Sequence, residues 1–321
     1  MRMVLGAIAL VLVAAVAVTL LRPQITRADL AIKPASERQC VRTALPTYKR
    51  KLGEYNRRVA ANDYMPYAIA TLNVYREGQR GRFKTFTLAA HSPRWKKVRS
   101  VKDRDGLGLD IYHAQTADQL TQLAVFRGTE TLDSADWLAN LSWLTAWLPI
   151  ETQYDIARRI YKRERRKAYQ AAGDRKVSFI TAGHSLGGGL AQHVAYAFPC
   201  VSAAVFNASF VTNKFRLAEP YSDAPIVHIF EDNDELTRLR RLIFADKETR
   251  TYKHYRQNAV RNDRDFQHSM TQLVAGMARQ VIRCQTKRDD CRVPADDLRT
   301  RQAFCGSIGA KRPICKSNGG S

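Results

Sequence analysis

The sequence predicts an α/β protein with a mostly parallel sheet flanked by helices. Short apolar runs alternate with helical patterns from about residue 120 onwards, and one run leads into a serine framed by glycines. This alternation favours a parallel sheet, because crossover helices cover the faces of such sheets. With 321 residues, 45% of them hydrophobic, the chain can bury a full core in one main domain.

The first elements precede the alternating pattern. Residues 40–75 predict two helices broken near Met65-Pro66, since apolar positions recur every three and four residues and proline ends helices. Residues 95–101 and 107–115 flank the polar turn at residues 103–106, which predicts a β-hairpin. No repeat or low-complexity linker interrupts residues 40–283.

Strands and helices then follow one another along the chain. The predicted strands are residues 120–126, 177–182, 203–207 and 226–230, and the predicted helices are residues 155–172 and 188–198. In sheets of this kind, functional residues gather at the carboxyl ends of the strands.

The N-terminal residues predict export. Residues 3–21 form an uncharged apolar run, and residues 26–28 are a possible cleavage site of a signal peptide. The run is 19 residues long, close to the ~20 that cross a bilayer, so a membrane anchor is an alternative. The expected location is periplasmic, secreted or membrane-anchored. Arg22, Arg27 and Lys33 follow the run, which leaves a cytoplasm-facing domain as a further alternative.

Cysteine usage also favours export. All six cysteines follow the apolar run, and an even number suits disulfides in an oxidising compartment. Four lie in residues 284–321 without a C-x-x-C pair, which favours a disulfide-stapled tail over a zinc ribbon. Buried reduced thiols are the alternative, and they fit Cys200 better than the tail. The expected organisation is residues 1–28 as signal or anchor, 29–283 as the main domain and 284–321 as the tail.

The formal net charge of +22 implies attraction to polyanions such as anionic lipid headgroups, lipopolysaccharide or nucleic acid. Residues 158–167 hold seven basic side chains. On a helix, these charges would point outward, either as a solvated face or as a patch facing a membrane. The core-facing stripe would consist of Ala157, Ile160, Tyr161, Ala168 and Ala171. Signatures of nucleic-acid modules are missing from the sequence, so no specific nucleic-acid partner is expected.

The strongest motif is Gly183-His184-Ser185-Leu186-Gly187, placed between a predicted strand and a predicted helix. This is the setting of a nucleophile elbow, in which a tight turn requires glycines and leaves the serine exposed at a helix N-terminus. An ordinary glycine-rich turn is the alternative. The context predicts Ser185 as a nucleophile.

A nucleophilic serine needs a base and an acid, which follow it in that setting in the order acid, then histidine. The strand at residues 226–230 ends in an acidic stretch, from which we select Asp234 as the acid and Asp232 as runner-up. His268 precedes an amphipathic run and is the expected base. His254 lies in a strand-like stretch and is expected to pack instead.

The third requirement is an oxyanion hole. Its expected donors are the amide of Leu186 and that of Thr129, in the loop after the strand at residues 120–126. His184 and His193 are expected to be structural, the first beside the elbow and the second on a helix surface. No metal or other cofactor is implied.

Together these residues resemble the class 3 lipases, the fungal-type triacylglycerol lipases and their bacterial relatives, which have the α/β-hydrolase fold. The matching blocks are residues 126–129, 136–138, 183–191 and 229–239, with His268 as the late histidine. The likeness covers roughly residues 67–277 and carries the triad acid over onto Asp234. It departs at residues 206–209, where the family usually has a Gly-x-Pro pattern.

The resemblance also implies a lid, for which residues 138–149 are the candidate. Trp143 and Trp147 would suit a lipid interface. The alternative is that Leu141, Leu144 and Leu148 simply form a core stripe.

The expected function is therefore hydrolysis of lipid carboxylic esters, of lipase or phospholipase type, through an acyl-enzyme at an anionic membrane surface. Arg238, Arg240 and Arg241 near the mouth of the site would favour phospholipids over neutral fat. The alternative is a non-catalytic envelope protein with a hydrolase-like domain that binds anionic lipid or polymer.

Overall fold

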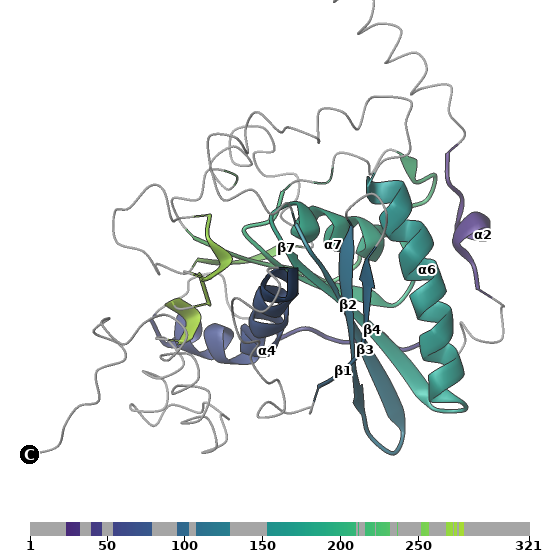
Figure 1. Ribbon diagram of the computed structural model, residues 1–321, viewed down its shortest axis with the longest axis horizontal. Helices are drawn as coiled ribbons and strands as arrows, with labels where there is room; N and C mark the ends of the chain where they lie inside the picture. The colour runs from purple at the N-terminus through teal and green to yellow at the C-terminus, as the bar shows by residue number, and fades with distance from the viewer. Residues whose placement is uncertain are drawn as a thin grey trace, which may run out of the picture.

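The computed structural model shows one sheet with helices on both of its faces (Figure 1). The residues it describes are 24–32, 40–46, 54–78, 95–102, 107–128, 153–209, 211, 216–221, 223–231, 236, 252–256, 268–271, 273–274 and 276–278. The N-terminal apolar run and the cysteine-rich tail lie outside them.

Within the described residues, the sheet has seven strands that neighbour one another in chain order. They are β1 (Lys96–Lys102), β2 (Gly108–Gln115), β3 (Gln119–Phe126), β4 (Lys176–His184), β5 (Val201–Phe206), β6 (Ile226–Phe230) and β7 (Tyr252–Arg256). β1, β2 and β3 pair antiparallel, which confirms the predicted hairpin, and β3 to β7 pair parallel. The carboxyl ends of β3 to β7 therefore share one edge.

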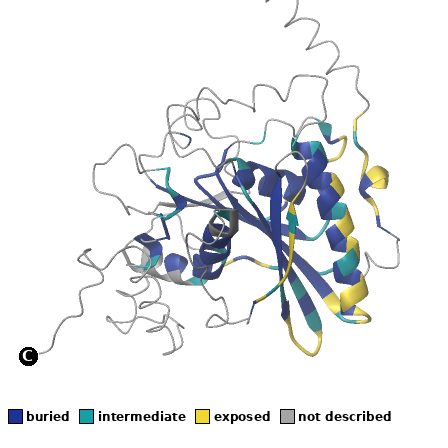
Figure 2. Ribbon diagram, in the orientation of Figure 1, coloured by how far each residue is buried: buried dark blue, intermediate teal, exposed yellow. Residues whose placement is uncertain are grey.

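Helices cover both faces and bury a core against each. α6 (Gln153–Ala172) and α7 (Leu186–Ala197) pack on one face, and α4 (Glu54–Gly78) packs on the other with helical residues from 270 onwards. Figure 2 shows the buried sheet between these layers and the exposed outer side of α6. The mostly parallel sheet, the flanking helices and the turn between β4 and α7 confirm the predicted α/β-hydrolase class.

The prediction of two helices broken at Pro66 was wrong, because α4 runs through Pro66 without interruption. An interior proline costs a helix about 3 kcal/mol. Tyr64, Met65 and Ile69 on either side of it are buried in the core. Burying each large apolar side chain is worth roughly 1.5–3 kcal/mol, so packing outweighs the local cost. Residues 40–46, also predicted helical, have no helix.

The predicted outward orientation of the α6 charges holds only in part. Arg159, Arg163 and Arg166 are exposed, whereas Arg158 and Arg165 are buried. Burial is possible because both buried guanidinium groups have hydrogen-bond partners, as buried charges require. Ala171, expected in the core stripe, is exposed.

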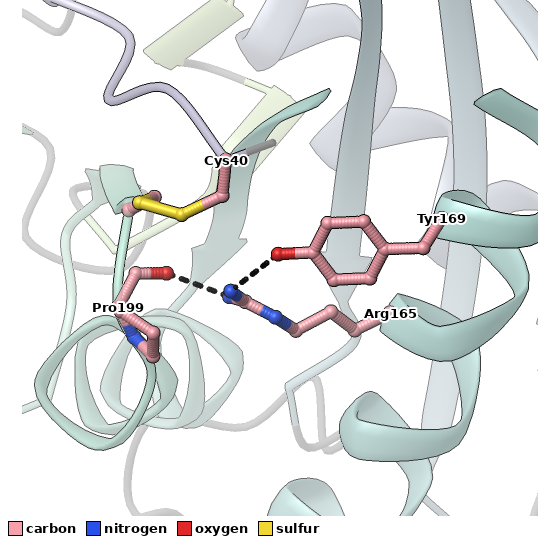
Figure 3. The surroundings of a disulfide bond; sticks show 5 residues. Cys40, Arg165, Tyr169 and Pro199 are labelled. Carbon is pink, nitrogen blue, oxygen red and sulfur yellow. Dashed lines mark hydrogen bonds between the residues drawn. A yellow bond between two sulfur atoms is a disulfide. The ribbon is translucent and has the colours of Figure 1, made fainter. Parts of the chain in front are cut away.

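Cys40 and Cys200 form a disulfide across 160 residues of sequence, with Cα atoms 6.1 Å apart (Figure 3). The alternative that Cys200 is a reduced thiol was therefore wrong. Cys40 reaches this position because the segment after it pairs with β4, where the Val41 N–H donates to the Val177 carbonyl at 2.8 Å. The bond ties the N-terminal part of the domain to the end of α7.

Arg165 lies beside this disulfide and joins α6 to the same region (Figure 3). Its guanidinium donates to the Pro199 carbonyl at 2.7 Å and to the Tyr169 hydroxyl at 2.9 Å. It also lies 4.3 Å from the centre of the Phe179 ring. These contacts compensate for burying a cation.

Residues 24–32 are part of the folded domain. Ile25 pairs with Leu217, and Thr26 caps the short helix α2 (Arg27–Leu30). Leu30 and Ile32 are buried in the same core cluster as the apolar residues of α6. A cut at the possible cleavage site would remove the Ile25 pairing. Within the described part of the chain, no helix combines the length and apolar character needed to span a membrane.

Candidate active site

The candidate site is built on the turn between β4 and α7. Ser185 occupies this turn with φ 55° and ψ −128°, a conformation that a residue with a Cβ rarely adopts. Its N–H donates to the Phe206 carbonyl at 3.2 Å, and its own carbonyl accepts from the N–H groups of Gly189 and Ser209. Strain that neighbouring elements hold in place is a common feature of functional sites.

Glycines on either side of Ser185 make the turn possible. A Cβ on Gly183 would lie 2.3 Å from the Gly187 carbonyl oxygen, and one on Gly187 would lie 2.3 Å from that of Phe126. Both distances are too short for any side chain. The motif therefore needs glycine at both positions, for the reason inferred from the sequence.

One feature of the turn differs from expectation, since Ser185 is only 3% exposed rather than open to solvent. The loop after β5 packs over the turn through the Ser209 hydrogen bond. The segment after β3 and residue 268 also lie against the elbow. Three segments distant in sequence therefore pack around the turn that holds the buried serine.

The structure brings His268 to the elbow. The Nε2 of His184 lies 2.7 Å from the carbonyl oxygen of His268, and the two rings lie 4.8 Å apart at an angle of 40°. His268 lies just before the helical residues that begin at Met270, as the amphipathic run predicted. Residues 83 positions apart in the chain, Ser185 and His268, are thus brought to the same edge of the sheet.

His184 links the elbow to its surroundings. A carbonyl only accepts hydrogen bonds, so the proton of the His184 ring lies on Nε2 and Nδ1 is left as an acceptor. The Tyr75 hydroxyl lies 3.2 Å from this Nδ1. Burial, together with a smaller electrostatic effect of the neighbouring His268, lowers the pKa of His184 well below its ordinary 6.5. The ring is therefore neutral at pH 7.

Tyr75, from α4, extends this link to the loop after β3. Its hydroxyl accepts from the Gly128 N–H at 3.0 Å and lies 3.2 Å from the His184 carbonyl oxygen. Sequence reasoning missed Tyr75, because nothing in the pattern of α4 marks a residue whose partners lie 53 and 109 positions away. His184, expected only to flank the elbow, connects three segments of the site.

The expected oxyanion donors flank the same turn. Leu186 is the first residue of α7, where backbone N–H groups have no acceptor within the helix and the helix dipole favours negative charge. Gly128, the residue before Thr129, lies against the elbow, since a Cβ on Gly187 would be 2.8 Å from its nitrogen. Thr129 itself lies outside the described residues.

The acid loop begins at the same edge of the sheet. The Glu231 N–H, just after β6, donates to the Asn207 side chain at 2.9 Å. Asn207 has φ 38° and belongs to the segment that departs from the lipase pattern. Its side chain thus holds the start of the acid loop beside β5. Asp234 and its runner-up Asp232 lie beyond the described residues.

Of the remaining residues singled out from the sequence, some lie within the described structure and others lie outside it. His254 lies on β7 opposite His228, in agreement with its strand interpretation, and His193 is fully buried rather than on a helix surface. His193 lies 2.5 Å from the Arg158 guanidinium. Outside the described residues are Trp143, Trp147, Arg238, Arg240 and Arg241. Among the described side chains, no group of three or more His, Cys, Asp or Glu could hold a metal ion.

Part of the chain is similar to a known family of phospholipase-like domains. Residues 73–221, somewhat less than half of the chain, match the family model described as a Tle-like phospholipase domain. This match confirms the resemblance to lipases that the motifs indicated. A search of curated proteins gave no significant match.

Two solved lipase structures are also similar. The Rhizomucor miehei lipase propeptide complex is 15% identical with a TM-score of 0.39, over 56% of this chain and 63% of that chain. The Lip2 lipase from Yarrowia lipolytica is 14% identical with a TM-score of 0.40, over 62% of this chain and 77% of that chain. This chain therefore spans less than two thirds of the length of the first of these relatives.

Proposed function

We propose that this chain is a serine hydrolase that cleaves carboxylic ester bonds of lipids, with phospholipids as the favoured class. The observation that carries the proposal is the strained Ser185 turn between β4 and α7, with His268 beside it. The match of residues 73–221 to a phospholipase-like domain supports the lipid substrate.

In the proposed first half-reaction, the Ser185 hydroxyl oxygen attacks the ester carbonyl carbon while its proton passes to the His268 ring. Asp234 would orient that ring and stabilise its positive charge. The amides of Leu186 and Thr129 would bind the oxyanion of the tetrahedral intermediate. Collapse breaks the bond to the alcohol, which takes the proton from His268 and leaves an acyl-enzyme.

In the second half-reaction, water attacks the acyl carbon and gives a proton to His268. The second tetrahedral intermediate releases the fatty acid and returns the proton to Ser185, so that the enzyme is regenerated. The neutral His184 ring would hold the main chain of His268 throughout, because its Nε2–H donates to the His268 carbonyl. No cofactor is needed for these steps.

The proposed enzyme acts outside the cytoplasm. The Cys40–Cys200 disulfide supports this location, since such bonds persist in oxidising compartments. Because Ser185 is 3% exposed, a lipid must displace part of its cover to reach it. Residues 138–149 remain the predicted lid.

The test is labelling and hydrolysis by the purified full chain. A fluorophosphonate probe should label Ser185, and Ser185→Ala should lower the hydrolysis rate by about 10⁵- to 10⁶-fold. His268→Ala should have a similar effect, whereas the control His254→Ala should keep activity in proportion to the folded fraction. Absence of labelling in a folded chain would favour the non-catalytic envelope protein instead.

Substrate class is tested on the same protein with an anionic phospholipid, a neutral triglyceride and a short-chain ester. The proposal expects the phospholipid to be hydrolysed fastest. Equal rates on all three would remove the argument from charge while leaving the esterase chemistry intact.

A further inference from the structure

The outer side of α6 carries a line of cations. Arg159, Arg163 and Arg166 are spaced by four and three residues, so they lie on one side of the helix, and all three are exposed. Figure 2 shows this exposed outer side of α6. Lys162 and Lys167 flank this line and are half-exposed. These five side chains, with Lys96 and Arg99 of the neighbouring β1, are named the α6 face below.

β1 extends the face because Arg99 reaches α6. Its Nε lies 3.5 Å from a carboxylate oxygen of Glu164. The same carboxylate also accepts from Lys167 at 2.8 Å and from Arg163 at 3.4 Å. One buried carboxylate is thus shared by three cations, and the α6 face keeps a large excess of positive charge.

The like charges on this face weaken the helix. Arg159 and Arg163, Lys162 and Arg166, and Arg163 and Lys167 are like charges four residues apart. Such pairs destabilise a helix by about 0.2–0.5 kcal/mol each. The packing of α6 comes from its opposite side, where Ala157, Tyr161 and Ala168 are buried in the core. The ion pairs of Glu164 with Lys167 and Arg163 offset only part of this cost, so the excess of outward cations points to a role other than folding.

The position of the N-terminal segment favours a bilayer as the partner of the α6 face. The Lys162 ammonium donates to the Asp29 carbonyl at 2.6 Å, and α2 lies beside α6 (Figure 1). The apolar run ends at Leu21, three residues before the first described residue, Gln24. Three residues span at most about 10 Å. A bilayer that held the apolar run would therefore lie close to the α6 side of the domain.

We infer that the α6 face docks on the surface of a bilayer containing anionic phospholipids, with its arginines binding lipid phosphates. Arginine suits this role because its planar guanidinium binds phosphate through two parallel hydrogen bonds. Each cation near an anionic bilayer strengthens binding about fivefold. The inference goes beyond the proposed hydrolysis and does not rest on it, since docking needs no turnover.

The test uses the full chain with Ser185→Ala, which keeps the vesicles intact. Partitioning is measured by flotation on phosphatidylcholine vesicles and on vesicles that also contain phosphatidylglycerol. The ratio of the two partition coefficients is the readout, because the apolar run contributes to both and cancels. In the parent, the ratio should be large at about 0.1 M salt and fall strongly at about 0.5 M.

The α6 variant carries Arg159→Gln, Arg163→Gln and Arg166→Gln, and its ratio should fall by roughly 100-fold. The control variant carries Arg42→Gln, Lys102→Gln and Lys176→Gln, which removes the same charge from exposed sites elsewhere. Its ratio should stay within about threefold of the parent. A third variant with lysine at the three α6 positions should retain most of the ratio, which separates loss of charge from loss of folding.

Two results would overturn the inference. Equal losses in the α6 and control variants would show that net charge alone attracts the chain to lipid. An unchanged ratio in the α6 variant would rule out docking through this face, and if that variant also lost retention on heparin, the partner would be an anionic polymer. A failed hydrolysis assay would change none of these conclusions about docking, because partitioning is measured without turnover.

Discussion

The Cys40–Cys200 disulfide should be a major source of stability. Replacing both cysteines by alanine removes the cross-link. Alanine is used at Cys200 because this residue has a φ of 60°, so a change to glycine would also relieve backbone strain. The bond closes a loop across 160 residues. For a loop of that size, the chain-entropy relation gives about 5 kcal/mol of stabilisation at 25 °C, and native disulfides typically contribute about 2–5 kcal/mol.

Urea unfolding followed by circular dichroism measures this effect as the difference in free energy of unfolding. We expect the double variant to lose about 2–5 kcal/mol, a large share of the roughly 5–15 kcal/mol typical of whole domains. The dependence of unfolding on urea should also become steeper, because an unlinked unfolded chain exposes more surface.

The four other cysteines require a control. Adding reductant to the double variant measures what they contribute, since Cys40 and Cys200 are then absent. A non-reducing peptide map of the parent should contain one linked pair with these two residues. A loss below about 1 kcal/mol with an unchanged urea dependence would refute the reasoning, as would a map without that pair.

Two further predictions concern the elbow and the pH dependence of the domain's stability. Tyr75→Phe removes the hydroxyl that joins His184 to the neighbouring loop, so kcat for ester hydrolysis should fall about 10- to 100-fold with little change in KM. The control Tyr64→Phe removes a hydroxyl that donates to a carbonyl away from the elbow and should leave kcat unchanged; equal effects would contradict the positioning role. The pKa values of His184 and His193 lie well below 6.5 in the folded state, mainly through burial. The unfolded chain therefore binds more protons, and stability should fall as pH drops below about 6.5, by up to about 1.4 kcal/mol per pH unit for each histidine. Urea unfolding at several pH values should show a shallower slope for His193→Gln, and an identical slope would count against this assignment.

Most strands could be predicted from the sequence because their own residues define them. Residues 226–230 are an apolar run of strand length, and β6 has those bounds. Proline and arginine led to the errors. Pro66 was interpreted from its local cost and Arg165 from its charge, but both are decided by residues distant in sequence that surround them.

In the candidate site, too, some features are encoded locally in the sequence and others depend on contacts between distant residues. The glycines around Ser185 encode the turn locally, so the motif identified it. The link through Tyr75 depends on α4 packing against the elbow, and only the three-dimensional structure reveals such a contact. Segments distant in sequence also pack around the turn, and the motif alone does not show that Ser185 is buried there.

The strand order bears on how the domain assembles during synthesis or translocation. Because each strand pairs with the one made just before it, a nascent chain can extend its sheet step by step as it emerges. His268 arrives after the seventh strand is complete. A polypeptide released before residue 268 would thus carry a nearly finished scaffold without its proposed proton acceptor, so the proposed chemistry would have to wait until that residue had been added.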